Sequence, residues 1–287
     1  MQLYEIGGIL FGLSDPEAEE LLDRLPGFRV FRNETDGQTP SFVISRSPEP
    51  LPQGGELVYH IDDVECSDIF FYRTSTGYLL SLGHPGSRTM GVEFREDSGQ
   101  PRLWGDYAPD TLRFAMWIAY GLAALPKGRV AVHSSCIVAD GRACLFLGES
   151  GTGKSTHTRL WRENIPGATL LNDDSPIVSA ESDGVWVYGS PWSGKTPCYR
   201  RERWPLAACV RLSQGPCNRI RPLSGMRALA ALHPSCPPEL ASSPALYGAL
   251  VPTLDAVLRS VKCFSMECLP DAEAARMSYA AALCGSF

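Results

Sequence analysis

A short apolar run leads directly into a glycine-rich loop at Ala143-Cys-Leu-Phe-Leu-Gly-Glu-Ser-Gly-Thr-Gly-Lys-Ser-Thr156. The loop satisfies the pattern G-x-x-x-x-G-K-[ST], whose fixed positions are Gly148, Gly153, Lys154 and Ser155. Ala143–Leu147 predicts a buried strand, and Ser155–Asn164, which contains neither Gly nor Pro, predicts a helix. A strand, a glycine-rich turn and a helix in this order predict a phosphate-binding loop at the start of the helix.

The loop predicts a site for ATP and Mg²⁺. Its glycines let the chain turn tightly, so that several backbone N–H groups can point into one hollow. We expect Lys154 to reach the outer phosphates and the Ser155 hydroxyl to coordinate Mg²⁺. The predicted nucleotide-binding residues are Gly148, Ser150, Gly151, Thr152, Gly153, Lys154, Ser155 and Thr156. Nothing in this segment distinguishes ATP from GTP.

Two adjacent carboxylates, Asp173 and Asp174, end the next predicted strand in Leu170-Leu-Asn-Asp-Asp-Ser175. Asp173 follows Lys154 by 19 residues, a spacing that can bring the pair beside the γ-phosphate. Phosphoryl transfer to a hydroxyl requires bound Mg²⁺ and a base for the hydroxyl proton, and two acids can divide these roles. The alternative is that the pair only caps a turn.

A histidine, His133, precedes Lys154 by 21 residues on a predicted strand, Arg129–Val138. Asp140-Gly141 is a two-residue hairpin signal between this strand and the strand that enters the loop. Such a hairpin would bring His133 to the phosphate end, where it could contact the γ-phosphate or orient Asp173. A purely structural histidine is the alternative.

A second segment, Gly189-Ser-Pro-Trp-Ser-Gly-Lys-Thr196, fits the same loop pattern. Pro191 lacks an N–H group and Trp192 is bulky, so we expect a substrate-side loop rather than the main phosphate site. Lys195, with Arg200, Arg201 and Arg203 close behind it, forms a local cationic cluster that could clamp a transferring phosphate or an anionic acceptor, and Lys195 and Arg200 are the predicted clamp residues. A solvated basic turn is the alternative.

The chain predicts two regions of a mixed α/β fold (α+β, mixed sheet). Residues 1–105 form a β-rich N-terminal region of unknown role, with one helix at Ser14–Leu25 and a strand at Phe28–Phe31 among the expected elements. Residues 106–287 form the nucleotide-binding domain, which begins with a mostly apolar helix at Asp110–Leu125.

The composition excludes several classes of function. A formal net charge of −6 argues against general nucleic-acid binding, which needs a basic surface. There is no apolar run of 18 residues and no basic-then-apolar N-terminus, so we expect a cytoplasmic protein that does not enter a membrane. The ten cysteines include no C-x-x-C pair and predict reduced thiols rather than a metal site. The oligomeric state stays open, a homo-oligomer included.

The segment His133–Ser155 resembles the core of bacterial HPr kinase/phosphorylase. That family has a strand led by His, a hairpin, a G-x-S-G-x-G-K-S loop and an A-D-D motif ending a strand, which Leu171-Asn-Asp-Asp174 matches with Asn172 in place of Ala. The loop also resembles that of phosphoenolpyruvate carboxykinase, whose fold the HPr kinases share. The resemblance covers residues 129–178 well and 106–287 loosely, and it implies a carboxykinase/HPr kinase-like P-loop core.

The resemblance implies a kinase that transfers the γ-phosphate of ATP to a hydroxyl of a protein, peptide or small molecule. It implies that Asp173 is the base, that Asp174 assists with metal or orientation, and that His133 lines the phosphate site. The downstream E-[IV]-R-G-x-G signature of the family differs here, because Trp186 and Tyr188 stand at its Glu and Arg positions. The sequence therefore gives no support to HPr as the acceptor and leaves the phosphorylase reaction open.

Two other functions stay open. A non-catalytic ATP-binding module, regulatory or partner-recognising, is favoured by the missing Glu and Arg and disfavoured by the intact Asp pair. An ordinary P-loop kinase of small molecules usually carries its loop near the N-terminus, whereas 147 residues precede Gly148 here. The acceptor itself has no signature in the sequence.

Overall fold

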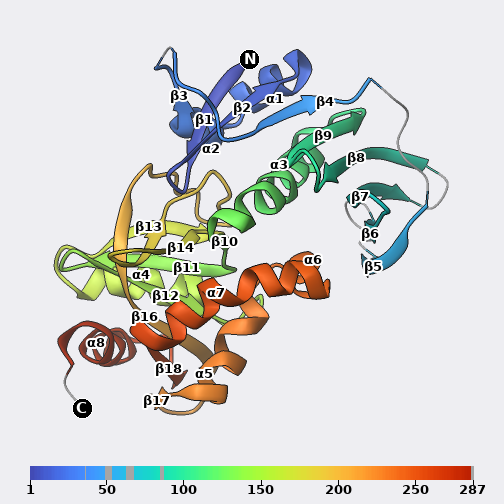
Figure 1. The fold of residues 1–287 in the computed structure, drawn as a ribbon. Coiled ribbons are helices and arrows are strands. Elements are labelled where there is room, and N and C mark those ends of the chain that lie inside the picture. The colour runs from blue at the N-terminus through green and yellow to red at the C-terminus, as the bar shows by residue number, and fades with distance from the viewer. Residues whose placement is uncertain (36, 49–53, 63–67, 85–86, 286–287) are drawn as a thin grey trace. The chain divides into compact units, whose positions relative to one another are not determined.

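The structure is a computed structural model, which describes residues 1–35, 37–48, 54–62, 68–84 and 87–285 (Figure 1). The chain divides into two compact units, and each contains one large mixed sheet with helices. The first unit comprises Met1–Lys127 and Pro238–Ala249, and the second comprises Gly128–Pro237 and Leu250–Phe287. The mixed α/β class expected from the sequence is confirmed.

The sheet of the first unit has the order β3-β1-β2-β4-β9-β8-β7-β6-β5. Its strands are β1 (Gln2–Ile6), β2 (Ile9–Ser14), β3 (Arg32–Asn33), β4 (Val43–Arg46), β5 (Glu56–Ile61), β6 (Ile69–Arg73), β7 (Gly77–His84), β8 (Ser87–Arg95) and β9 (Gln100–Gly105). β4 is parallel to both β2 and β9, and the other pairs are antiparallel. The β-rich character expected for the N-terminal region is confirmed.

The packing of its helices determines where the first unit ends along the chain. They are α1 (Pro16–Arg24), α2 (Pro26–Phe31), α3 (Pro109–Ala124), the 3₁₀ turn η1 (Leu125–Lys127), α6 (Pro238–Ala241) and the first residues of α7 (Pro244–Ser260). The side chain of Asp15 caps α1 by accepting hydrogen bonds from the N–H groups of Glu17 and Ala18. The apolar helix α3 packs on β7, β8 and β9, so the first unit extends to Lys127 rather than to residue 105.

The strand expected at Phe28–Phe31 is wrong, because these residues belong to helix α2. Pro26 suits the first turn of a helix, where its missing N–H group costs nothing. Phe28 and Phe31 are both buried, while the two residues between them are exposed. A spacing of three places both rings on one helix face, whereas in a strand they would point to opposite sides.

The sheet of the second unit has the order β10-β14-β15-β16-β12-β11-β13, with β18 beside β16 and β17 beside β18. Its strands are β10 (Arg129–Ala131), β11 (Ser134–Ala139), β12 (Arg142–Leu147), β13 (Thr169–Asp174), β14 (Ile177–Glu181), β15 (Gly184–Tyr188), β16 (Arg203–Gln214), β17 (Arg219–Leu223) and β18 (Lys262–Cys268). β12 and β18 run parallel to β16, and β11 lies antiparallel between β12 and β13.

Helix α4, which follows the glycine-rich loop, is fixed by its buried face. The helices of this unit are α4 (Lys154–Asn164), α5 (Gly225–Leu232), the 3₁₀ turn η2 (His233–Ser235), the rest of α7, α8 (Ala272–Tyr279) and the π-helical turn η3 (Ala280–Cys284). The fully buried Trp161 packs edge-on against Phe146 and donates to the Ser278 hydroxyl at 2.8 Å. His157 contacts the same hydroxyl, and burial lowers the pKa of His157 to about 4.

No described helix is long and apolar enough to cross a membrane.

The hairpin expected at Asp140-Gly141 is confirmed, since it joins β11 to β12. Both residues have positive φ, 49° and 69°, as a type I′ turn requires. The continuous strand expected at Arg129–Val138 is wrong, because it breaks before β11 at His133. β10 pairs with β14, whereas β11 pairs with β12 and β13, so the chain changes partners at the break. The N–H group of His133 donates instead to the carbonyl of Ser235 at 2.7 Å.

Candidate functional site

The glycine-rich loop joins β12 to α4, and its conformation requires glycine. Gly148, Gly151 and Gly153 have φ values of 149°, 82° and 100°. A Cβ atom at position 148 would lie 2.5 Å from Oγ1 of Thr152, which is too close for any side chain. The same Thr152 hydroxyl donates to the carbonyl of Glu149 at 2.8 Å and closes the turn.

A cleft of about 300 Å³ opens beside this loop. Its lining comes from the loop, the start of α4, the end of β13 and two flanking segments: His133, Ser134, Ser150, Gly151, Gly153, Lys154, Ser155, Thr156, Asp173, Asp174, Gly194 and Lys195. Ligand pockets in proteins begin at about this volume. Predicted residues from four separate stretches of sequence therefore meet in one cleft, whereas Gly148 and Thr152 of the predicted set do not line it.

The ammonium of Lys154 is held at the mouth of the loop. Its Nζ atom donates to the carbonyls of Gly148 (2.8 Å) and Glu149 (3.2 Å) and lies 3.0 Å from Nε2 of His133. Burial lowers the pKa of Lys154, and nearby carboxylates, Asp174 first, oppose this effect. A phosphate group entering the cleft could replace the two carbonyl contacts with charge-assisted hydrogen bonds.

Asp173 is buried against the first turn of α4. The Ser155 hydroxyl donates to Oδ1 of Asp173 at 2.9 Å, and the backbone N–H of Thr196 donates to Oδ2 at 3.2 Å. Its backbone carbonyl accepts from the N–H of Gly194 at 2.6 Å. Only 4% of Asp173 is exposed, so both of its carboxylate oxygens are occupied and shielded from solvent.

Asp174 points to the other side, toward His133. Oδ1 of Asp174 lies 3.3 Å from Nδ1 of His133, and Oδ2 accepts from the Ser175 hydroxyl at 2.9 Å. The Asp174 side chain is 33% exposed and that of His133 47%. For Lys154 to donate to Nε2, a neutral His133 must carry its proton on Nδ1, where it can donate to Asp174. The three side chains thus lie in a connected series from the carboxylate of Asp174 to the ammonium of Lys154.

Asn172 anchors the second GK loop, Gly189–Thr196, to the acidic end of β13. This fully buried side chain places Nδ2 3.2 Å from the carbonyls of Ser190 and Trp192 and from the Ser190 hydroxyl. Its Oδ1 atom accepts from the N–H groups of Asp174 (3.1 Å) and Ser175 (2.9 Å). The sequence predicted no role for Asn172, and the structure gives this buried amide a structural one.

The second GK loop lies against β13 at Gly194 and against the segment before β16 at Gly189. A Cβ atom at Gly194 would lie 2.7 Å from the carbonyl of Asp173, and one at Gly189 would lie 2.0 Å from the carbonyl of Arg200. Lys195 is exposed and lines the cleft. Arg200 does not line the cleft and instead forms an ion pair of 3.5 Å with Glu202. Of the two cations expected in the clamp, the structure places only Lys195 at the cleft.

Two further residues, which the sequence did not single out, hold the loop from β16. The guanidinium of Arg211 pairs with the Glu149 carboxylate at 2.6 Å, and Nε2 of Gln214 donates to the carbonyl of Gly151 at 3.0 Å. Their place in the strand order could have predicted these contacts, because β16 runs parallel to the strand that enters the loop. Side chains at the carboxyl ends of two adjacent parallel strands face the same edge of the sheet.

The donor set of the cleft fits Mg²⁺ bound together with a nucleotide. The hydroxyl of Ser155 and the carboxylates of Asp173 and Asp174 are hard oxygen ligands. Within the described part of the chain, no three or more His, Cys, Asp or Glu side chains gather to hold a metal ion. In phosphoryl-transfer sites Mg²⁺ is held by one or two carboxylates together with phosphate oxygens and water, and this mode needs no larger cluster.

Comparison with known proteins gives no independent assignment. No protein-family model matches the chain, and no curated protein is significantly similar to it in sequence. The function is therefore argued from the geometry of the cleft.

Proposed function

We propose that this protein is a Mg²⁺-dependent kinase that transfers the γ-phosphate of ATP to a hydroxyl acceptor, on a carboxykinase/HPr kinase-like P-loop core. One observation carries the proposal: the phosphate loop and both acids share a cleft. Ser155 contacts Asp173 directly, and Asp174 is linked to Lys154 through His133. Phosphoryl transfer needs a phosphate cradle, a metal site and a proton acceptor at this range of one another.

The geometry favours exchanging the roles that the family resemblance gave to the two acids. Asp173 has both oxygens engaged and is nearly inaccessible, so it suits a position beside Ser155 at the metal. Asp174 is partly exposed and its Oδ1 atom lies 3.3 Å from Nδ1 of His133, so it suits the proton acceptor. Mg²⁺ held by Ser155 and Asp173 would supply neutralisation of the charge on the β- and γ-phosphate oxygens.

The proposed transfer forms one bond to phosphorus and breaks another. The acceptor oxygen forms a bond to Pγ as the bond from Pγ to the β,γ-bridging oxygen breaks, and the acceptor proton passes to Asp174. The products are ADP and a phosphorylated acceptor. The ammonium of Lys154 moves from the loop carbonyls to the phosphates and, with Lys195, offsets the charge on the transferring group. His133 holds the carboxylate of Asp174 in position beside the cleft.

A second candidate is a non-catalytic ATP-binding module, and one observation favours it. The positions that carry Glu and Arg in HPr kinases hold side chains built into a structural cluster on β15. The guanidinium of Arg203 lies over the Trp186 ring at 4.3 Å and donates to the hydroxyl of Tyr188 at 3.0 Å. Tyr188 in turn donates to Glu181. These residues stabilise the sheet and offer no group for transfer.

Release of ADP distinguishes the two candidates. The full chain is incubated with ATP and Mg²⁺, and ADP is measured with a panel of hydroxyl acceptors: serine-containing peptides, hydroxy acids, sugars and polyols. The kinase proposal expects at least one acceptor to stimulate ADP release more than tenfold, with the phosphorylated product seen by mass spectrometry. Saturable ATP binding with no stimulation and no product by any acceptor would instead support the non-catalytic module.

A further inference from the structure

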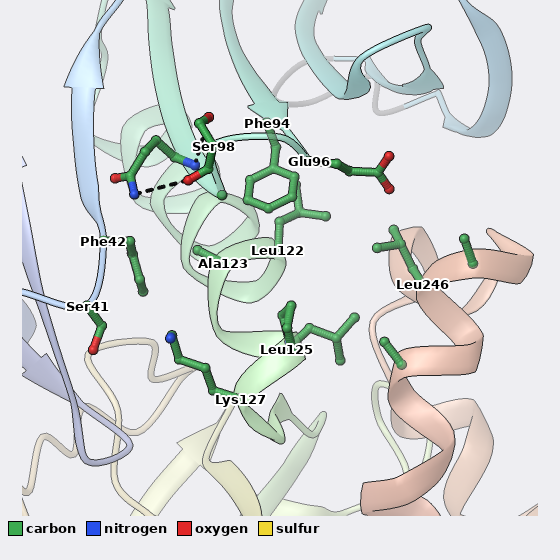
Figure 2. A pocket seen from close by; sticks show the side chains of 15 residues that line it. Ser41, Phe42, Phe94, Glu96, Ser98, Leu122, Ala123, Leu125, Lys127 and Leu246 are labelled. Atoms are coloured by element: carbon green, nitrogen blue, oxygen red, sulfur yellow. Dashed lines mark hydrogen bonds between the residues drawn. The ribbon is translucent and has the colours of Figure 1, made fainter.

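A second cavity, of about 380 Å³, lies in the first unit and shares no residue with the cleft (Figure 2). Four segments surround it: residues 41–42 before β4, residues 94–100 around the turn from β8 to β9, the end of α3 with η1, and the start of α7. All of its lining residues belong to the first unit. At this volume it could hold about a dozen water molecules or one small organic ligand.

The floor of this cavity is apolar. The buried side chains among its lining residues are Phe42, Phe94, Leu122, Ala123, Leu125 and Leu246. Figure 2 shows the Phe94 ring beside Leu122, with Leu125 below them and Leu246 on the facing helix. Water against such a floor finds few hydrogen-bond partners, so its displacement by an apolar group is favourable by about 25 cal/mol per Å² of surface covered.

The rim of the cavity carries one cationic side chain and one anionic side chain. The carboxylate of Glu96 is engaged with the guanidinium of Arg73 through two contacts of 2.8 Å, which offset its charge. The ammonium of Lys127 lies on the side of the cavity near Ser41 (Figure 2). An ammonium has three donors, so Lys127 can hold a ligand oxygen while it keeps another contact.

We propose that this cavity binds a small amphipathic carboxylate, with its alkyl or aryl body on the apolar floor and its carboxylate on Lys127. One cation at the rim matches a single negative charge, and an apolar floor with one polar end matches a molecule of the same pattern. The proposal does not depend on the kinase assignment, because the cavity shares no residue with the phosphate loop or the acids.

The test compares probes of equal length that differ only in the head group. Octanoate, octanol and octylamine are titrated into the full chain by isothermal calorimetry, with 4-phenylbutanoate as a second carboxylate. We expect saturable binding of both carboxylates, at least tenfold tighter for octanoate than for octanol, and weakest binding of octylamine. Binding of octanol or octylamine as tightly as octanoate, or no saturation by either carboxylate, would overturn the proposal.

Matched variants locate the binding. Lys127→Met should remove the preference for octanoate over octanol, whereas Lys262→Met, which changes an exposed lysine of the second unit, should leave it intact. Ala245 is exposed at the rim, so Ala245→Trp can fill the cavity without disturbing the core, and it should weaken both ligands at least tenfold. Thermal unfolding confirms that each variant is folded. Octanoate binding unchanged in Lys127→Met or in Ala245→Trp would contradict the assigned site.

Discussion

The Ser155 hydroxyl donates a hydrogen bond of 2.9 Å to Oδ1 of Asp173. Ser155 lies in the first turn of α4, after the glycine-rich loop, and Asp173 lies near the end of β13, which is separated from the loop strand β12 by β11. The contact brings together two oxygen atoms of the kind that coordinates Mg²⁺. It also leaves the neighbouring acid, Asp174, directed at His133.

Replacement of the loop lysine should remove nucleotide binding. In Lys154→Met the ammonium that faces the cleft is lost, and we expect affinity for Mg²⁺-ATP to fall at least tenfold, as followed by calorimetry. Lys262→Met is the control, because it removes the same charge from an exposed site on β18. Equal affinities in the two variants would show that the nucleotide does not use this loop.

Variants of the two acids should lose different properties: one the effect of Mg²⁺ on ATP affinity, the other turnover. In Asp173→Asn we expect Mg²⁺ to enhance ATP affinity much less than in the unchanged protein, because the metal loses a charged ligand. In Asp174→Asn we expect that enhancement to persist while acceptor-stimulated ADP release falls by a factor of about 100 or more. Titrations with and without Mg²⁺, combined with turnover measurements, read both effects. The reverse pattern would mean that Asp173, and not Asp174, is the proton acceptor.

Removal of the buried amide of Asn172 should destabilise the second unit. Asn172→Ala leaves the N–H groups of Asp174 and Ser175 and the carbonyls of Ser190 and Trp192 without their partner. We expect a loss of about 2–4 kcal/mol in the free energy of unfolding, measured in urea.

The matched control is Asn164→Ala, which removes one hydrogen bond, to the carbonyl of Leu160, from a half-buried site at the end of α4. It should cost no more than about 1 kcal/mol. A similar small loss in Asn172→Ala would mean that the second GK loop does not depend on this amide.

The stability of the first unit should depend on pH through Glu239. Burial raises the pKa of Glu239 from its ordinary value of 4.5 to about 7, and Oε2 has no hydrogen-bond partner among the described residues. Because the folded pKa is the higher one, the stabilising contribution is complete below pH 4.5 and is lost as the pH rises through about 7.

Glu239→Gln cannot ionise and should lack this dependence. Relative to the unchanged protein, the variant should gain about 1–3 kcal/mol in the free energy of unfolding between pH 5 and pH 8, measured by denaturation at each pH. Parallel pH profiles for the two proteins would show that the carboxyl of Glu239 does not titrate in this window.

Local signals in the sequence were sufficient for much of the second unit. The loop with its flanking strand and helix and the hairpin at Asp140-Gly141 appear where they were expected. Each has a short-range cause: glycines at positive φ, a type I′ dipeptide, or an apolar run of strand length. The juxtaposition of the loop with the acids also followed from the order of these elements.

The remainder depended on contacts between distant segments. The sequence places Val132 and His133 in a strand. No local signal shows that the chain changes its pairing partner here, from β14 to β12 and β13. The helix at Pro26–Phe31 was not predicted because its residues favour β-strands. The structure forms a helix here and buries both Phe rings on one face of it. The contacts of Arg211 with the loop likewise arise from strand order in the sheet.

The most direct measurement of the central claim is a crystal structure of the full chain with Mg²⁺ and a non-hydrolysable ATP analogue. We expect the β- and γ-phosphates on the backbone amides around Gly151, with Lys154 on the γ-phosphate and Mg²⁺ between Ser155 and Asp173. We also expect the carboxylate of Asp174 to face the open side of the γ-phosphate, where an acceptor would enter. Phosphates bound at Gly189–Thr196, or an analogue bound away from the cleft, would contradict the claim.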